Sequence, residues 1–411
     1  MKSLLRDFSL SAVVAGLLAV IISYAGPLAI FYQAAQAGHM SDAMFASWVW
    51  GISVGAAVSG IVLSAWLKVP VITAWSAPGT ALLLTLFPGL ALGEAVGAYL
   101  TAAALLLLIG VTGIFDALVA RIPRGVASGM MAGILLQFGL NAFNAIGTMP
   151  LLAGGMLAAY LLLRRLLPRY CIVLLLAAGI ALALATGSTR FSALHLSLVT
   201  PRWIAPVWSW QATLSLALPL VVTTLAGQYL PGMAVLNAAG YRQPVRPLMV
   251  VASLASLATA CTGGITTAVA AITAALCTGP DAHQDPARRY IAGIASGLFF
   301  LVGGLCAGSL VLLFAALPKA LIASLAGLAL LGAITSSLAG VVGAEDHREA
   351  AVIAFLSTAS GMRFMGMGAA FWGIVIGMLA YWVLRAPKKM AGATAPAPDQ
   401  RPSEPAATPA R

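Results

Sequence analysis

The residues that could carry chemistry in this chain are neutral, and they gather at two interrupted apolar stretches. The first stretch covers residues 68–87, KVPVITAWSAPGTALLLTLF. Its first half is β-branched and aromatic, which favours extended chain, and Ser76 followed by Pro78 predicts a helix start. The amino end of that helix would leave the backbone N–H groups of Gly79 and Thr80 unpaired. Such an end carries partial positive charge, so the stretch predicts an anion-binding backbone.

The apolar run after Pro78 is too short to cross a bilayer. Residues 78–87 would form about 15 Å of helix at 1.5 Å per residue, whereas a bilayer core is about 30 Å thick. The amino end of this half-helix would therefore lie near mid-membrane, where irregular backbone is tolerated only inside protein or beside a cavity. An ordinary span with a kink at Pro78 is the alternative that this stretch leaves open.

A second glycine-broken stretch, residues 259–267, leads into another short apolar run at 268–277, which we expect to be a helix. It contains Gly264, Thr266 and Thr267. Two discontinuous segments in corresponding places of two halves are a strong pointer to a transport site.

Acidic residues are absent from the expected membrane interior. All eleven Asp and Glu residues fall in loops, in the tail or at the ends of apolar runs, whereas a cation site or a carboxylate proton relay normally needs one at depth. The four His and four Cys residues show no metal-ligand spacing, so we expect no metal and no cofactor. The polar residues left at depth are Tyr24, Gln33, Gln137, Asn141, Asn144, Thr223, Thr224, Gln228, Thr266 and Thr267.

The aromatic residues near these positions suggest what kind of anion would bind. Phe31, Trp75 and Tyr229 are consistent with a ligand that has an apolar or aromatic body. Ordinary core packing explains the same aromatics equally well, and the residues alone leave both interpretations open.

Composition identifies the class of protein that must position these groups. The chain has 411 residues, of which 61% are hydrophobic and 8% are charged, whereas soluble domains carry about 25% charged residues. Apolar runs of spanning length, with shorter ones at the two breaks, predict an all-α polytopic membrane protein with about fourteen crossings. The net charge of +11 lies in short loops, so it indicates topology and not nucleic-acid binding.

The crossings divide into two related sets of seven. We expect a first repeat over residues 1–187, an extracytoplasmic loop over 188–210, a second repeat over 211–385 and a disordered cytoplasmic tail over 386–411. The segments RIPRG at 121–125 and ALPKA at 316–320 match at an offset of 195. The crossing count places them on opposite sides of the membrane, as an inverted repeat requires. Chance similarity of two apolar helices is the alternative.

Basic residues set the orientation. With the amino terminus inside, 18 of the 22 Lys and Arg residues fall on the inner side, and both termini are cytoplasmic. The four on the outer side are Arg190, Arg202, Lys319 and Arg363. A wrong crossing count would scramble this asymmetry.

Several motifs resemble the benzoate/H+ symporter family of BenE type. They are SYAGP at 23–27, TAWSAPGT at 73–80, AAITAA at 270–275 and DPARRY at 285–290. The resemblance covers nearly the whole chain short of the tail. It implies a bacterial inner-membrane carrier that moves benzoate with a proton. It also implies kinship with uracil-permease-type transporters, in which seven-plus-seven inverted repeats form core and gate domains. In those relatives, short strands in spans three and ten precede half-helices that face the substrate.

Two departures from the uracil permeases bear on the substrate. By position, Gln228 stands where those proteins carry a glutamate. The stretch around Gly264 lacks the ionisable residue found there in nucleobase carriers. Both departures argue against a nucleobase, and both leave the route of the proton open.

The resulting expectation is a secondary active transporter that imports benzoate or a similar aromatic carboxylate by proton symport. Another organic or inorganic anion, or a nucleobase, on the same fold is the alternative within transport. A membrane enzyme would need buried acid, base or metal groups, and a channel would need a continuous polar lining. The expected partners are the carboxylate, a proton and the lipid bilayer, with a homodimer left open. The candidate substrate-binding residues are Tyr24, Phe31, Trp75, Ser76, Gly79, Thr80, Gln228, Tyr229, Gly264, Thr266 and Thr267.

Overall fold

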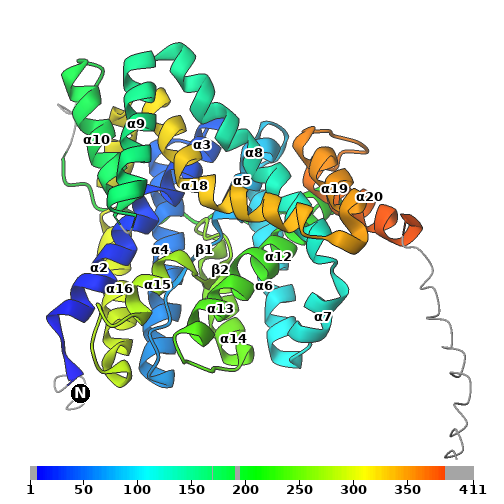
Figure 1. Cartoon of the computed structure of the whole chain (residues 1–411), viewed down its shortest axis with the longest axis horizontal. Coiled ribbons are helices and arrows are strands. Elements are labelled where there is room, and N and C mark those ends of the chain that lie inside the picture. The colour runs from blue at the N-terminus through cyan, green and yellow to red at the C-terminus, as the bar shows by residue number, and fades with distance from the viewer. Residues whose placement is uncertain (1–6, 169, 190–194, 385–411) are drawn as a thin grey trace, which may run out of the picture.

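The computed structural model describes residues 7–168, 170–189 and 195–384 and is mostly helical (Figure 1). The predicted tail lies outside the described residues. The first half contains α2 (Leu10–Ala25), α3 (Pro27–Ala37), α4 (Asp42–Leu67), β1 (Thr73–Trp75), α5 (Ala77–Leu86), α6 (Leu92–Thr112), α7 (Phe115–Arg121), α8 (Arg124–Thr148), α9 (Pro150–Leu166) and α10 (Cys171–Ala185).

The second half repeats this order. It begins with a helix that contains two π-helical turns, at Thr213–Ala217 and Leu225–Tyr229. Its elements are α11 (Trp210–Ala212), α12 (Leu218–Thr224), α13 (Leu230–Ala238), α14 (Val245–Ala260), β2 (Thr267–Val269), α15 (Ile272–Thr278), α16 (Tyr290–Leu305), α17 (Ala307–Ala316), α18 (Lys319–Val342), α19 (Arg348–Ala359) and α20 (Ala369–Leu384). Helices α8 and α18 begin directly after Pro123 and Pro318, so their starts keep the offset of 195 found in the sequence.

The two strands pair with each other in the middle of the molecule. They run antiparallel, with Thr73 opposite Val269 and Trp75 opposite Thr267. The Ser76 N–H donates to the Thr266 carbonyl at 2.9 Å and extends the pairing toward α5. Buried backbone groups must find partners, and here each strand satisfies the other. Because the strands are antiparallel, the short helices that follow them extend in opposite directions.

The second short helix differs from the one expected at 268–277. Ala268 and Val269 belong to β2, and α15 begins at Ile272. The reason is local: the β-branched Thr266, Thr267 and Val269 favour extended chain, as residues 71–75 do in the first half. The sequence expectation of a helix from Ala268 is wrong at this point.

The helices form two groups that pack mainly among themselves. The first group consists of α2–α6, α11–α17 and both strands, and the second of α8, α9, α10, α18, α19 and α20. Figure 1 shows α9, α10 and α18 above the strands and α13, α14 and α15 below.

Small residues allow close packing within each group. A Cβ at Gly129 would lie 2.3 Å from the Ala351 carbonyl oxygen of α19. In the first group, a Cβ at Gly293 would lie 2.9 Å from the Ser64 Cβ of α4. These glycines therefore serve helix packing within the subunit.

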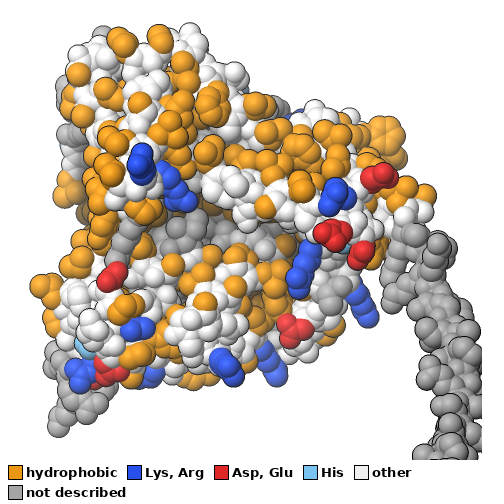
Figure 2. All heavy atoms as spheres, viewed as in Figure 1, with side chains coloured by type: hydrophobic (Ala, Val, Ile, Leu, Met, Phe, Trp, Pro, Cys, Tyr) orange, Lys and Arg blue, Asp and Glu red, His pale blue; other side chains and the backbone are white. Residues whose placement is uncertain are grey.

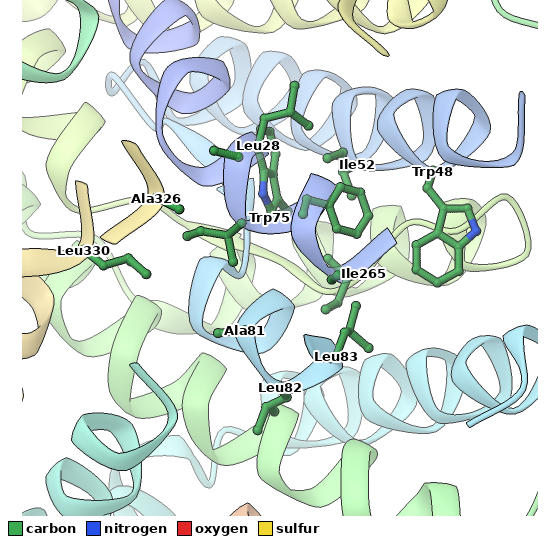
Figure 3. Packing of buried hydrophobic residues seen from close by; sticks show 14 of the residues in the cluster. Leu28, Trp48, Ile52, Trp75, Ala81, Leu82, Leu83, Ile265, Ala326 and Leu330 are labelled. Atoms are coloured by element: carbon green, nitrogen blue, oxygen red, sulfur yellow. The ribbon is translucent and has the colours of Figure 1, made fainter. Parts of the chain in front are cut away.

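Large apolar side chains fill the interior around the strands. Figure 3 shows Leu28, Trp75 and Ile265 together with Leu82 and Leu83 of α5. All five are buried. Ala326 and Leu330 of α18 reach the same region from the second group (Figure 3). The first half-helix is therefore held by packing on several sides.

Helix length and composition agree with a membrane protein. In the described part of the chain, six helices are long and apolar enough to cross a bilayer. They are 10–37 (α2 with α3), α4, α6, α8, 210–238 (α11 to α13) and α18. The pair made of residues 286–305 and α17 passes the same test together but bends by 69°.

Candidate functional site

A cavity of about 980 Å³ separates the two helix groups. Figure 2 shows the surface hollowed between the upper and lower parts of the molecule. The first group lines the cavity with parts of α2, α13, α15 and the second π-helical turn, and the second group with parts of α8, α9, α10 and α18. The lining is mostly apolar, and its charged members are Arg124, Arg164 and Asp281. All three are exposed, which places them toward the mouth.

The wall of the cavity comes near the amino end of α5 at Gly227, although no residue of α5 lines it. Leu225, Ala226 and Gly227 of the second π-helical turn form part of the wall. A Cβ at Gly227 would lie 2.8 Å from Met131 Cε and 3.7 Å from Pro78 Cγ. The absence of a side chain at Gly227 thus lets Met131 pack closely against this turn beside Pro78. The π-helical turn, a feature that is frequent at functional sites, positions this glycine.

The second half-helix borders the cavity directly. Ala271, Ala275 and Gly279, spaced by four residues, all line it. Ala271 precedes α15 and makes no side-chain cap hydrogen bond. Helix α15 and the residues that flank it therefore form one wall of the cavity, with Leu276 as its large side chain.

The backbone N–H groups at the amino end of α5 already have hydrogen-bond acceptors within the chain. Ser76 Oγ accepts from the Gly79 N–H at 3.1 Å, and the Ser76 carbonyl accepts from the Thr80 N–H at 2.8 Å. The Thr80 hydroxyl donates to the same carbonyl at 2.9 Å. The expectation that the N–H groups of Gly79 and Thr80 are unpaired is therefore wrong. Ser76 in the cap position supplies both acceptors.

The polar residues before α15 lie in the packed interior and not on the cavity. Thr266 Oγ1 is 3.1 Å from Thr224 Oγ1, and the Thr267 N–H donates to Ser256 Oγ at 2.9 Å. The Thr267 hydroxyl is buried without a hydrogen-bond partner. Gly264 packs against α14, because a Cβ there would lie 2.7 Å from Thr259 Cβ.

Tyr24 and Trp75 are brought together beside β1. Their ring centroids are 5.9 Å apart, and Tyr24 also contacts Phe300 edge-on at 5.7 Å. The Tyr24 hydroxyl is 2.7 Å from Ser53 Oγ of α4. These two candidates form one cluster within the first helix group.

The other two aromatic candidates lie in different clusters. Phe31 stacks on Trp48 at 5.7 Å and meets Phe45 edge-on at 5.6 Å. Tyr229 is fully buried and contacts Phe115 at 6.4 Å. The four aromatics therefore do not form a single box around one ligand. Gln228 is half-buried and directly follows the cavity-lining Gly227.

Arginines that sequence reasoning assigned only to topology bind the carboxyl ends of both half-helices. Arg289 is buried, and its Nη1 and Nε donate to the Thr278 and His283 carbonyls, each at 2.7 Å. Arg363 Nη2 donates to the carbonyls of Thr85 and Leu86 at the end of α5. A cation at a helix carboxyl end is favourable. The sequence signal available beforehand was that Arg289 lies in the DPARRY motif and that Arg363 is one of four basic residues on the outer side.

The loop around Arg289 is further fixed by polar contacts. Tyr241 donates to the Pro286 carbonyl at 2.9 Å, and burial raises the pKa of its hydroxyl, which therefore stays protonated. Tyr290 donates to Asp7 at 2.9 Å, and Arg288 Nε is 3.4 Å from an Asp285 carboxylate oxygen. The segment that follows α15 is thereby tied to the residues before α2 and before α14.

Carboxylates stay away from the interior in the part of the chain that the structure describes. No Asp or Glu among these residues is buried. Glu94 accepts from the Ala91 N–H at 3.1 Å, which caps the start of α6. Asp116 is exposed in the first turn of α7. Both are placed as ordinary helix-end residues.

Comparisons with known proteins agree with this architecture. The family described as benzoate membrane transport protein matches residues 6–383. The chain is 55% identical over 388 residues to the benzoate membrane transport protein of Acinetobacter baylyi, covering 94% of this chain and 98% of that protein. It is 42% identical over 382 residues to the inner membrane protein YdcO of Escherichia coli, covering 92% and 98%.

Solved structures of other transporters share the fold. The transmembrane domain of the cyanobacterial bicarbonate transporter BicA aligns with a TM-score of 0.59 at 15% identity, covering 90% of this chain and 96% of that one. SLC26A9 aligns with a TM-score of 0.61 at 14% identity, covering 93% of this chain and 67% of that one. At these identities the likeness concerns the fold alone.

Proposed function

The chain belongs to the benzoate membrane transport protein family, and from this premise we propose that it imports benzoate or a closely similar aromatic carboxylate together with a proton. Members of this family are membrane transporters and not enzymes. The observation that carries the proposal is the cavity between the two helix groups, because a carrier needs a compartment that one rearrangement can expose to either side.

The chemistry of the cavity supports an anion with an apolar body. Apolar side chains form most of its wall, and the small residues Ala271, Ala275 and Gly279 in and around α15 leave space for a ring. Arg124 and Arg164 outnumber Asp281 among its charged lining residues. This balance attracts a carboxylate and disfavours a cation.

We place the bound substrate at the inner end of the cavity, beside Pro78, Gly227 and Ala271. Of the residues singled out in the sequence, Tyr24, Trp75 and Gln228 stay candidates for substrate contact, because they adjoin the strands or Gly227. Ser76, Gly79 and Thr80 shape the end of α5 at this place. Phe31, Tyr229, Gly264, Thr266 and Thr267 would support the site through packing.

The proposal includes a membrane topology. Each strand with its half-helix would make one discontinuous crossing, the third and the tenth of fourteen in a seven-plus-seven inverted repeat. The shorter apolar helices, such as α10, α14 and α20, would supply the crossings that helix length alone does not identify. The protein would lie in the bacterial inner membrane with both termini in the cytoplasm, so that the cavity opens inward.

We propose that the proton travels on the carboxylate of the substrate. A bare carboxylate is costly to move through a site closed to water, and protonation removes most of that cost. Glu94 and Asp116 sit at helix ends, which leaves the substrate as the simplest proton acceptor. Glu94→Gln and Asp116→Asn, singly and together, should keep accumulation of benzoate driven by a pH gradient. A variant that still exchanges benzoate but no longer accumulates it would assign the proton to the protein.

Uptake into proteoliposomes tests the substrate class. Radiolabelled benzoate is competed with salicylate, acetate, uracil and sulfate under a pH gradient. Competition by salicylate, with little by acetate, uracil or sulfate, is the expected result. Competition by sulfate would favour a carrier of inorganic anions on the same fold. No uptake of any ring acid would contradict the proposal.

A further inference from the structure

The carboxyl ends of the two half-helices are bound by arginines of different origin. Arg289 lies immediately before α16, and both it and α15 belong to the first helix group. Arg363 lies between α19 and α20 of the second group, whereas α5 belongs to the first. The contact of Arg363 with α5 therefore crosses between the two groups.

The loop that carries Arg363 is a compact unit, which we call the latch loop (residues 362–368). Phe364 and Met367 exchange backbone hydrogen bonds of 3.1 and 3.0 Å. The Trp372 Nε1–H of α20 donates to the Phe364 carbonyl at 3.0 Å. The latch loop is thus fastened to its own helix group.

Further contacts join the latch loop to the first group. The Gly368 N–H donates to Ser215 Oγ of the first π-helical turn at 3.1 Å. A Cβ at Gly368 would lie 2.8 Å from Leu86 Cδ2, and a Cβ at Gly366 would lie 3.2 Å from the Gln211 side chain. Together with the bonds of Arg363 to α5, these contacts join the two groups at this end.

The closed end lies across the molecule from the cavity mouth. The latch loop meets the chain just before α6 begins, whereas Arg124 of the mouth follows α7, beyond the other end of α6. Helix α6 has 21 residues, which corresponds to about 30 Å. The two groups are therefore apart on one side and joined by Arg363 on the other.

We propose that Arg363 and the latch loop form an outer latch that holds the carrier in the state with the cavity open inward. This inference rests on the proposed transport function, because only a carrier must open both sides in turn. Opening the outer side separates the second group from the end of α5, so the bonds of Arg363 to Thr85 and Leu86 must break. The bonds of Arg289 stay within one group and persist. Loss of the latch therefore depopulates the inward-open state.

Cysteine labelling measures this population without any substrate. Ala275→Cys places a thiol on the cavity wall, and inverted membrane vesicles expose the cytoplasmic side to a membrane-impermeant maleimide. The parent chain, which has four native cysteines, provides the background rate. Because no substrate is added, the result is informative even if benzoate is not the cargo.

The expected result is slower labelling when the latch is removed. Adding Arg363→Ala to the reporter should lower the labelling rate about threefold to tenfold, the range for loss of a partly exposed charge-assisted hydrogen bond. Ser215→Ala should act in the same direction with a smaller change. Arg202→Ala is the matched control, since Arg202 is also predicted outside and is exposed.

Two outcomes would overturn the proposal. The first is a labelling rate in Arg363→Ala equal to that in Arg202→Ala, with the melting temperature of the parent. If Arg363→Ala does not fold, Ser215→Ala decides the question, and an unchanged rate in that variant is the second. If benzoate is not taken up but the labelling rate changes clearly, the proposed substrate is wrong and the proposed latch is supported.

Discussion

The units β1–α5 and β2–α15 have the same plan, yet they differ at both ends of their helices. Helix α5 begins after the cap residue Ser76 and packs against Leu220. Helix α15 begins at Ile272, after Ala271, which makes no side-chain cap, and it lines the cavity. At the carboxyl ends, α5 is bound by Arg363 of the other helix group and α15 by Arg289 of its own. The two halves therefore contain one short helix that is buried and capped by its own chain and one that lines the cavity.

This difference shows why a helix amino end does not by itself identify an anion site. Each short helix follows a strand, and a partial positive charge is intrinsic to the amino end of each. At α5 the serine oxygens already accept the available N–H groups. What distinguishes α15 is the open volume next to it, which depends on helices from the other group.

The largest expected effect comes from filling the cavity beside α15. Ala275→Phe should lower benzoate uptake on the order of tenfold or more, since steric overlap readily exceeds the ~1.4 kcal/mol that corresponds to tenfold. Initial uptake rates in proteoliposomes measure this. Ala158→Phe, on an exposed face of α9, is the matched control. Near-parental uptake by Ala275→Phe would remove α15 from the substrate route.

The arginine at the end of α15 should matter for stability. Arg289→Gln removes a buried guanidinium that donates to several carbonyls. The free energy of unfolding should fall by about 2–3 kcal/mol, because hydrogen bonds from charged groups carry that value. Melting temperatures in detergent check it. Arg348→Gln, where one exposed Nε–H donates to the Val342 carbonyl, is the control with little change. Equal losses in both variants would deny Arg289 a special role.

The cap residue of α5 should contribute less to stability than Arg289 does. The corresponding position before α15 should contribute little. Ser76→Ala should cost about 1 kcal/mol of stability, the usual value of an N-cap side chain. Ala271→Ser should gain little, because Ser76 has the extended backbone of a cap residue whereas Ala271 is helical. Thermal unfolding of both variants tests this. If Ala271→Ser gains as much stability as Ser76→Ala loses, the two helix amino ends are equivalent and the expected difference is wrong.

The smallest effects are expected at the threonines. Thr80→Val and Thr267→Val should leave benzoate affinity nearly unchanged, because the Thr80 hydroxyl binds its own helix and Thr267 is buried away from the cavity. Thr267→Val removes an unpartnered hydroxyl, so its stability should be retained. Direct binding of labelled benzoate measures the affinity. A loss of about tenfold, or ~1.4 kcal/mol, in either variant would return these side chains to the site.

The sequence by itself determined the class of protein and the position of its breaks. The low share of charged residues and the long apolar runs identify a membrane protein, because composition largely determines whether a chain is soluble or inserts into a bilayer. The β-branched run before Ser76 and Pro78 fixed β1 and the start of α5, since both signals act within a few residues. In the second half the strand was expected only from the family resemblance, and the helix after it was expected too early.

Only the tertiary structure decided which of the candidate residues face open space. The sequence does not distinguish the three aromatic residues Phe31, Trp75 and Tyr229, which all lie near polar residues expected at membrane depth. In the structure they pack in separate clusters. Gly227 and Ala271, which carry no functional group, line the cavity. Arg289 and Arg363 bind helix ends reached only through folding. Cavities and contacts between helix groups depend on residues far apart in the chain, so no local pattern encodes them.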